Sequence, residues 1–150
     1  MTVLQPAKVV DFLETRAKDL ERNALLQLTA DQVRGAGEPY TSVYLYMLHG
    51  DELRLEAFSG RETEHDRIKV GHGVCGTAVA EGKDQNVPDV RVRENYIACN
   101  RFTRSELVVL IRKGGEILGQ IDIDSDVPDP FSEDEQSALK TVADFLGRIL

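Results

Sequence analysis

The chain has 150 residues, 41% of them hydrophobic and 29% charged, and its formal net charge is -8. This length suits a single domain over residues 1–150 that buries a core of its own. Phosphate binding needs a basic face, so the acidic balance argues against a nucleic-acid partner. No apolar run reaches the ~20 residues of a membrane span. With no secretory signal and too few cysteines for a disulfide scaffold, we expect a cytoplasmic protein.

Helical periodicity is clear at both ends of the chain. Apolar residues recur every three or four positions over residues 9–28, which predicts one continuous first helix. The last helix is expected to begin at Ser132, because Ser132 and Glu135 fit a capping box. Both helices carry an apolar stripe, from which we expect a homodimer that packs these helices together.

Four segments rich in β-branched, aromatic or alternating residues predict strands, and tight polar turns join them into two hairpins. They are residues 41–48 with 52–58, and residues 107–112 with 117–124. Hairpin strands pair antiparallel and need helices over one face. The fold class is therefore α+β with a central antiparallel sheet.

The middle of the chain is less regular. Residues 59–72 read as a polar loop, Gly73–Gly76 opens a short helix that ends at Glu81, and residues 85–87 form a short strand. Residues 89–104 have no clear period and predict a long loop, which in a compact domain is usually functional or mobile.

Two thiols stand outside the regular apolar faces, Cys75 in GVCG and Cys99 in NYIACNRF. Either could be a small buried hydrophobe, or a nucleophile if its thiolate is accessible. We expect Cys75 to lie at the mouth of the short helix, where the helix dipole would lower its pKa. His72 stands three residues before it, but no second tight pair follows, so no metal site is predicted.

Three carboxylates are expected on one face of the sheet. Asp122 and Asp124 stand two apart on a strand and point the same way, and Glu106 precedes the partner strand of the same hairpin. Such a cluster can bind an ammonium group or hold a proton for transfer, and at least one pKa should rise. The alternative is a solvated or salt-bridged sheet face.

A succession of short motifs from about Val43 to the C-terminus resembles the GAF domain family. In order they are GVCGTA at 73–78, VPDV at 87–90, IAC at 97–99, SELVV at 105–109, GQIDIDS at 119–125 and FS at 131–132. The resemblance implies a GAF-like fold, in which the N- and C-terminal helices pack on one face of the antiparallel sheet and the other face holds a small-molecule pocket.

Within that family, GVCG together with IAC, SE and DIDS looks most like the free methionine-(R)-sulfoxide reductases. The resemblance implies that Cys99 attacks the sulfoxide sulfur and that Glu106, Asp122 and Asp124 line the substrate pocket. The family's usual resolving cysteine corresponds to His65 here, so Cys75 is the thiol left to resolve Cys99. A thioredoxin-type dithiol would be the reductant, with no metal or organic cofactor. The alternative function is a non-catalytic GAF sensory domain that binds a small ligand.

Overall fold

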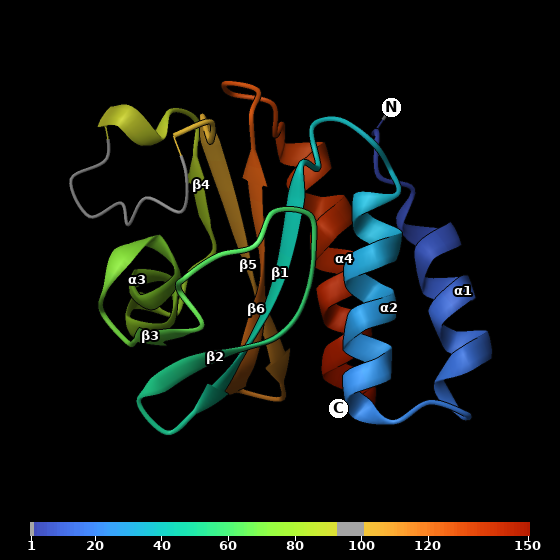
Figure 1. The fold of residues 1–150 in the computed structure, drawn as a ribbon. Coiled ribbons are helices and arrows are strands. Elements are labelled where there is room, and N and C mark those ends of the chain that lie inside the picture. The colour runs from blue at the N-terminus through green and yellow to red at the C-terminus, as the bar shows by residue number, and fades with distance from the viewer. Residues whose placement is uncertain (1, 93–100) are drawn as a thin grey trace.

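The computed structural model describes residues 2–92 and 101–150, which form a six-stranded sheet with helices on both sides (Figure 1). The strands are β1 (Ser42–His49), β2 (Glu52–Ser59), β3 (Arg67–Lys69), β4 (Gln85–Val87), β5 (Ser105–Lys113) and β6 (Glu116–Ser125). Their order is β3-β2-β1-β6-β5-β4, and every neighbouring pair is antiparallel. The predicted α+β class with an antiparallel sheet is confirmed.

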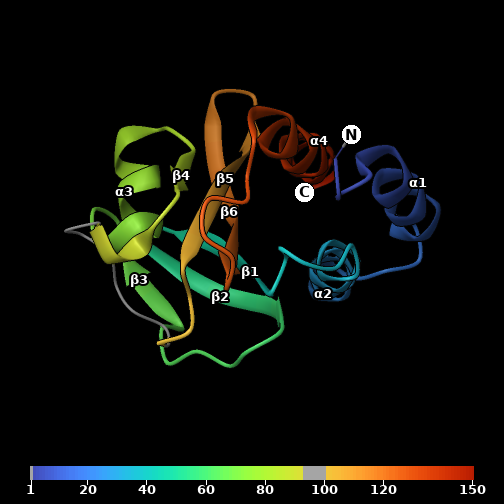
Figure 2. The same cartoon turned by 90° about the horizontal axis from the view of Figure 1, so that it is seen from above.

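The helices divide between the two faces of this sheet. They are α1 (Pro6–Ala17), α2 (Arg22–Arg34), α3 (Gly73–Glu81) and α4 (Glu133–Ile149), with a short 3-10 helix, η1 (Val90–Val92). Figure 2 shows α2 and α4 against one face, α1 outside them, and α3 on the opposite side. The expected placement of the terminal helices on one face is therefore confirmed.

The expected single first helix is wrong, because the chain breaks it into α1 and α2. Backbone hydrogen bonds from Asp19 to Arg16 and from Leu20 to Ala17 close a tight turn at the break. The turn lets α1 pack against α2 and α4, where Val9 and Leu13 are buried.

The loop expected over residues 59–72 contains a strand that the periodicity does not reveal. β3 has three residues with one buried side chain, Ile68, and it pairs with the start of β2 through Glu52, Leu53 and Arg54. Three residues are too few to show a strand-like alternation of apolar and polar side chains. This edge strand is held by its backbone pairing with β2. The long loop after residue 89 begins with η1, and residues 93–100 lie outside the described part of the chain.

Strand alternation creates two apolar layers, one on each face of the sheet. In β1, Val43, Leu45 and Met47 join the core under α1, α2 and α4. Tyr44 and Tyr46 point the opposite way, into a smaller cluster beneath α3. The same period-2 rule places the polar residues of β6 beneath α3, where the candidate site lies.

Glu135 ties the N-terminal segment to the core. Its Oε1 accepts from the backbone N–H of Val3 at 2.6 Å, and its Oε2 accepts from the N–H of Leu4 at 3.1 Å and from the hydroxyl of Tyr40. Ser132 Oγ does accept from the Glu135 N–H, as a capping box requires. The Glu135 carboxylate binds the N-terminal segment and Tyr40 instead of the Ser132 backbone. Only the Ser132 side-chain bond of the predicted capping box therefore forms.

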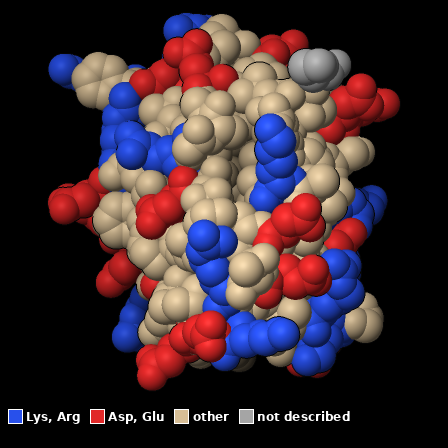
Figure 3. All heavy atoms as spheres, turned by 90° about the vertical axis from the view of Figure 1, so that its right-hand side faces the viewer, with Lys and Arg blue, Asp and Glu red and all other residues tan. Residues whose placement is uncertain are grey.

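The outer side of the helical layer is mixed in charge. Figure 3 shows Lys and Arg interspersed with Asp and Glu over this face. Most of the apolar stripe of the end helices is buried or half-buried within the chain, and among the described helix residues Ile149 is its large exposed side chain. The homodimer stays a prediction. No described helix combines the length and apolar character that crossing a membrane requires.

Candidate functional site

A small hollow lies between α3 and the sheet, on the face away from α1, α2 and α4. The residues around it come from β1, the β2–β3 loop, β3, α3, β5 and β6. They are Tyr46, His65, Ile68, His72, Gly73, Val74, Cys75, Glu106 and Asp122. The described residues leave room for about one water molecule inside it. Any larger ligand therefore needs its walls to move apart.

The register of β5 and β6 brings the carboxylates to this side. Glu106 stands directly opposite Asp124, and Asp122 stands opposite Val108. Ile121 and Ile123, the alternate residues of β6, are fully buried in the helix-covered core. Glu106 and Asp122 line the hollow, whereas Asp124 shares their face of the sheet and is buried beside Glu106 without lining it.

The GVCG segment brings α3 close to the sheet. Gly73 begins the helix at φ +64, a conformation that side chains disfavour. A Cβ on Gly76 would overlap the backbone carbonyl oxygen of Lys69, so only glycine lets α3 approach β3 this closely. The buried Gln120 amide donates to the Cys75 carbonyl at 3.0 Å and fixes the first turn of α3 over β6.

As a result, Cys75, Glu106 and Asp122 meet at one point. The Cys75 Sγ donates to Glu106 Oε2 at 3.7 Å, and one candidate ligand atom from each of the three residues lies within 4.8 Å of the others. All three side chains are buried. Three groups that can each carry negative charge thus share a site with almost no water, where one ionised group opposes the ionisation of the next.

The pKa of Cys75 runs against the expectation from the helix dipole. Burial raises it well above the ordinary value of a thiol, and the charges of Asp122 and Glu106 raise it further. The expected lowering at the mouth of α3 is therefore wrong, because desolvation and two carboxylates outweigh a helix terminus. In the resting protein Cys75 is a protonated thiol that donates to a carboxylate.

Asp122 is one of three carboxylates buried on this face of the sheet. It is 2% exposed, and burial raises its pKa, while hydrogen bonds shared with Glu106 and Cys75 oppose that rise. Its Oδ1 is buried and has no hydrogen-bond partner within the described residues. A buried carboxylate oxygen without a partner can accept a hydrogen bond from a ligand or bind a cation.

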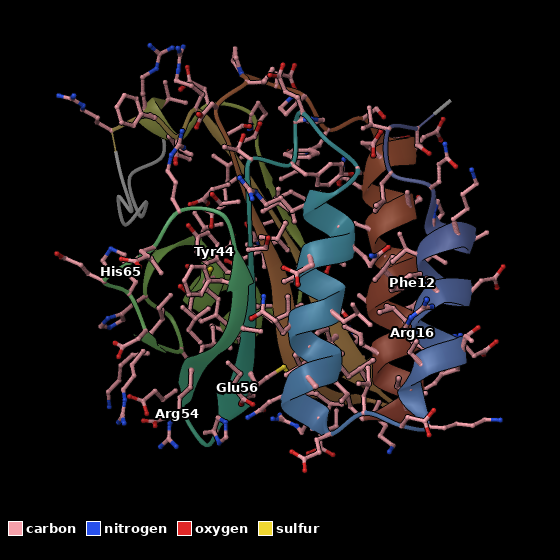
Figure 4. All side chains as sticks on the ribbon, turned by 45° about the vertical axis from the view of Figure 1, so that its right-hand side comes forward. Phe12, Arg16, Tyr44, Arg54, Glu56 and His65 are labelled. Atoms are coloured by element: carbon pink, nitrogen blue, oxygen red, sulfur yellow. The ribbon has the colours of Figure 1, made fainter. Side chains whose placement is uncertain are left out.

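Two tyrosines that the sequence motifs did not single out lie on this face of the sheet, and Tyr46 lines the hollow. The Tyr46 hydroxyl donates to the His65 carbonyl and the Tyr44 hydroxyl to the Arg61 carbonyl, both at 2.7 Å. Figure 4 shows Tyr44 and His65 on the side of the sheet opposite α1. The sequence signal that could have placed both tyrosines on this face is the alternation Tyr44-Leu45-Tyr46. It matches the alternation of Asp122 and Ile123 in β6, and Tyr44 stands opposite Asp122.

Arg61 fastens the loop that carries His65 to the segment just after β6. Arg61 binds Asp126 through two hydrogen bonds of 2.5 and 2.6 Å, which joins the β2–β3 loop to the end of β6. His65, at the position of the expected third cysteine, does line the hollow beside Cys75. Cys99 lies outside the described residues, and the Cys99–Cys75 pair stays a prediction.

Comparison with known proteins agrees with this architecture. The GAF domain model matches residues 21–150. A free methionine-R-sulfoxide reductase of Escherichia coli is 38% identical over 139 residues, covering 93% of this chain and 78% of the relative. Protein YtsP of Bacillus subtilis is 43% identical over 144 residues, 96% of this chain and 85% of the relative.

A solved structure extends the likeness to three dimensions. The free methionine-R-sulfoxide reductase of Neisseria meningitidis, determined in complex with its substrate, superposes with a TM-score of 0.88 at 31% identity. The match covers 98% of this chain and 89% of that one. The resemblance drawn from the GVCG, IAC, SE and DIDS motifs is confirmed.

Proposed function

The chain belongs to the GAF domain family, and from that premise we propose that it reduces free methionine-(R)-sulfoxide to methionine. The observation that carries the proposal is the meeting of Cys75, Glu106 and Asp122 in one buried hollow. Relatives named as free methionine-R-sulfoxide reductases, matched over most of this chain, support the choice of substrate.

The acidic hollow suits the ammonium group of a free amino acid. Asp122 Oδ1 offers a buried acceptor, and Glu106 and Asp124 add negative charge on the same face. A peptide-bound methionine sulfoxide has no such ammonium group, so it would leave these carboxylates unpaired in a dry site. The single-water space beneath α3 must widen as the amino acid enters.

The first chemical step is assigned to Cys99. Its sulfur attacks the sulfoxide sulfur while a carboxylic acid of the cluster, or a water that the cluster holds, protonates the sulfoxide oxygen. The oxygen passes to Cys99, which becomes a sulfenic acid, and methionine leaves with the two electrons of the thiol. The raised pKa of Asp122 favours its protonated, proton-donating form.

The second step is assigned to Cys75. The Cys75 sulfur attacks the sulfenic sulfur of Cys99, an S–S bond forms, and the sulfenic oxygen leaves as water. Because the resting Cys75 is protonated, a base must take its proton, and Glu106 Oε2 stands 3.7 Å from Sγ. A thioredoxin-type dithiol then reduces the disulfide and restores both thiols. The proposed cycle uses no metal or organic cofactor.

The test is a coupled assay that follows NADPH consumption through thioredoxin reductase and thioredoxin. Three substrates are compared: free methionine-(R)-sulfoxide, the S epimer and a peptide-bound sulfoxide. We expect turnover with the free R epimer alone. Turnover of the peptide would contradict the ammonium subsite, and no reduction of any substrate would favour the non-catalytic sensory domain.

Two serine variants separate the roles of the thiols. Cys99→Ser should abolish methionine formation, whereas Cys75→Ser should release about one methionine per chain and then stall. His49→Gln, an exposed residue on β1 paired with Glu56, is the control and should retain full activity. If Cys75→Ser keeps its steady-state rate with thioredoxin, the reductant acts on Cys99 directly and the role given to Cys75 is wrong.

A further inference from the structure

The hollow beneath α3 has the composition of a transition-metal site. A thiol from α3 and carboxylates from β5 and β6 converge there, with ligand atoms of Cys75, Glu106 and Asp122 within 4.8 Å of one another. Ligands around one tetrahedral zinc ion stand about 3.3–3.8 Å apart, given bond lengths of about 2.0–2.3 Å. Small side-chain rotations would therefore bring all three donors onto a single ion.

A second observation points to a capacity to bind a cation at this place. Asp122 is 2% exposed and lines the hollow, and its Oδ1 lacks a hydrogen-bond partner among the residues that the structure describes. The space beside it holds about one water, which is more room than a bare zinc ion occupies. Buried carboxylates are normally paired or coordinate a metal.

Histidines at the rim can complete the coordination. His65 and His72 both line the same hollow. His72 is the N-cap of α3 and its side chain makes no capping hydrogen bond to the helix. An imidazole added to a thiolate and two carboxylates gives a mixed sulfur, nitrogen and oxygen set. This set suits Zn²⁺, whereas Mg²⁺ and Ca²⁺ prefer oxygen ligands alone.

We propose that this hollow binds Zn²⁺ through Cys75, Glu106 and Asp122, with a rim histidine as the fourth ligand, and that the bound ion blocks sulfoxide reduction. The thiol proton is released to solvent as the sulfur–zinc bond forms. The ion would hold the carboxylates needed for the substrate ammonium and mask the resolving thiol. Only this blocking effect rests on the proposed function, because the metal site itself does not require an active reductase.

The metal site is tested with Co²⁺ as a spectroscopic probe on the full chain, kept reduced with a phosphine because thiol reductants bind zinc. Wild type should show a thiolate-to-cobalt charge-transfer band in the near ultraviolet together with the strong visible absorption of tetrahedral Co²⁺. Cys75→Ser should lose the ultraviolet band. Cys99→Ser, the matched variant at the other thiol, should keep it.

Affinity for Zn²⁺ is then measured by competition with a chromophoric chelator. Asp122→Asn should weaken binding at least tenfold, and His49→Gln, which alters the exposed His49–Glu56 pair, should leave it unchanged. Absence of the cobalt band in wild type, its persistence in Cys75→Ser, or equal weakening by His49→Gln would each overturn the site.

The blocking effect is tested in a single turnover without thioredoxin, whose own thiols bind zinc. Methionine release from pre-reduced, chelator-treated protein should occur, should fall when Zn²⁺ is added, and should return with excess substrate or chelator. Unchanged release with zinc bound would overturn the block. If the metal-free protein releases no methionine, the proposed function fails, and the cobalt spectra still decide the metal site.

Discussion

Replacing Asp122 with asparagine should stabilise the fold while it abolishes the proposed activity. The substitution keeps the shape of the side chain and removes one charge from a buried cluster. Unit charges 4.8 Å apart, the limit on the spacing of Asp122 and Glu106 ligand atoms, repel by about 3.5 kcal/mol at an effective dielectric constant of about 20. Weakened hydrogen bonds offset about 1 kcal/mol each. The expected net gain in unfolding free energy is about 1–3 kcal/mol.

The difference in unfolding free energy between Asp122→Asn and wild type should depend on pH. Burial raises the pKa of Asp122 above its ordinary 3.8, so the folded state holds this proton more tightly than the unfolded chain does. Its contribution to stability therefore falls as the pH rises from the unfolded pKa through the folded one, and it stays low above both. Asp122→Asn removes that fall. The variant should match wild type at low pH and exceed it at neutral pH.

Urea unfolding followed by circular dichroism, at pH values from below the unfolded pKa to neutral, measures both effects. Asp89→Asn is the matched control, because Arg91 holds the pKa of Asp89 down at about 2. That carboxylate adds stability above its unfolded pKa and loses it as the pH falls toward 2, so its replacement should bring no gain. The reasoning is refuted if Asp122→Asn is less stable than wild type at neutral pH. It is also refuted if the variant keeps the pH dependence of the wild-type unfolding free energy.

Three further predictions concern neighbouring features. Glu135→Gln should lower the unfolding free energy by about 2–4 kcal/mol in urea titrations, because an amide cannot accept all three hydrogen bonds that hold the N-terminal segment and Tyr40; a change within error would contradict the tether. Gly76→Ala should lower the melting temperature, since its Cβ overlaps the Lys69 carbonyl, and an unchanged melting curve would disprove that close packing. In Cys99→Ser protein, iodoacetamide should modify Cys75 more slowly than a free thiol at the same pH, and mass spectrometry that finds equal rates would contradict its raised pKa.

Local periodicity was enough to predict the sheet and the faces of its strands. Ile121 and Ile123 alternate with Asp122 and Asp124, and period-2 geometry alone sends the two pairs to opposite faces. The hairpins follow from short turns between alternating segments. These features depend on residues close together in the chain, so they can be read without knowledge of what packs where.

Other features depended on contacts between distant segments. The break between α1 and α2 exists because α1 gains burial against α4, and β3 exists because β2 offers it a ladder. Glu135 looks like a capping residue in the sequence, but residues more than ninety positions away take its carboxylate.

The candidate site shows the same division most sharply. The sequence supplied Cys75, Glu106 and Asp122 as separate candidates, and the helix dipole was the one influence on the Cys75 pKa that could be read locally. Folding places that thiol, out of water, against two carboxylates that lie 31 and 47 residues further along the chain (106 − 75 and 122 − 75). Desolvation and charge proximity are properties of the packed site, so only the tertiary structure could decide that the pKa of Cys75 rises.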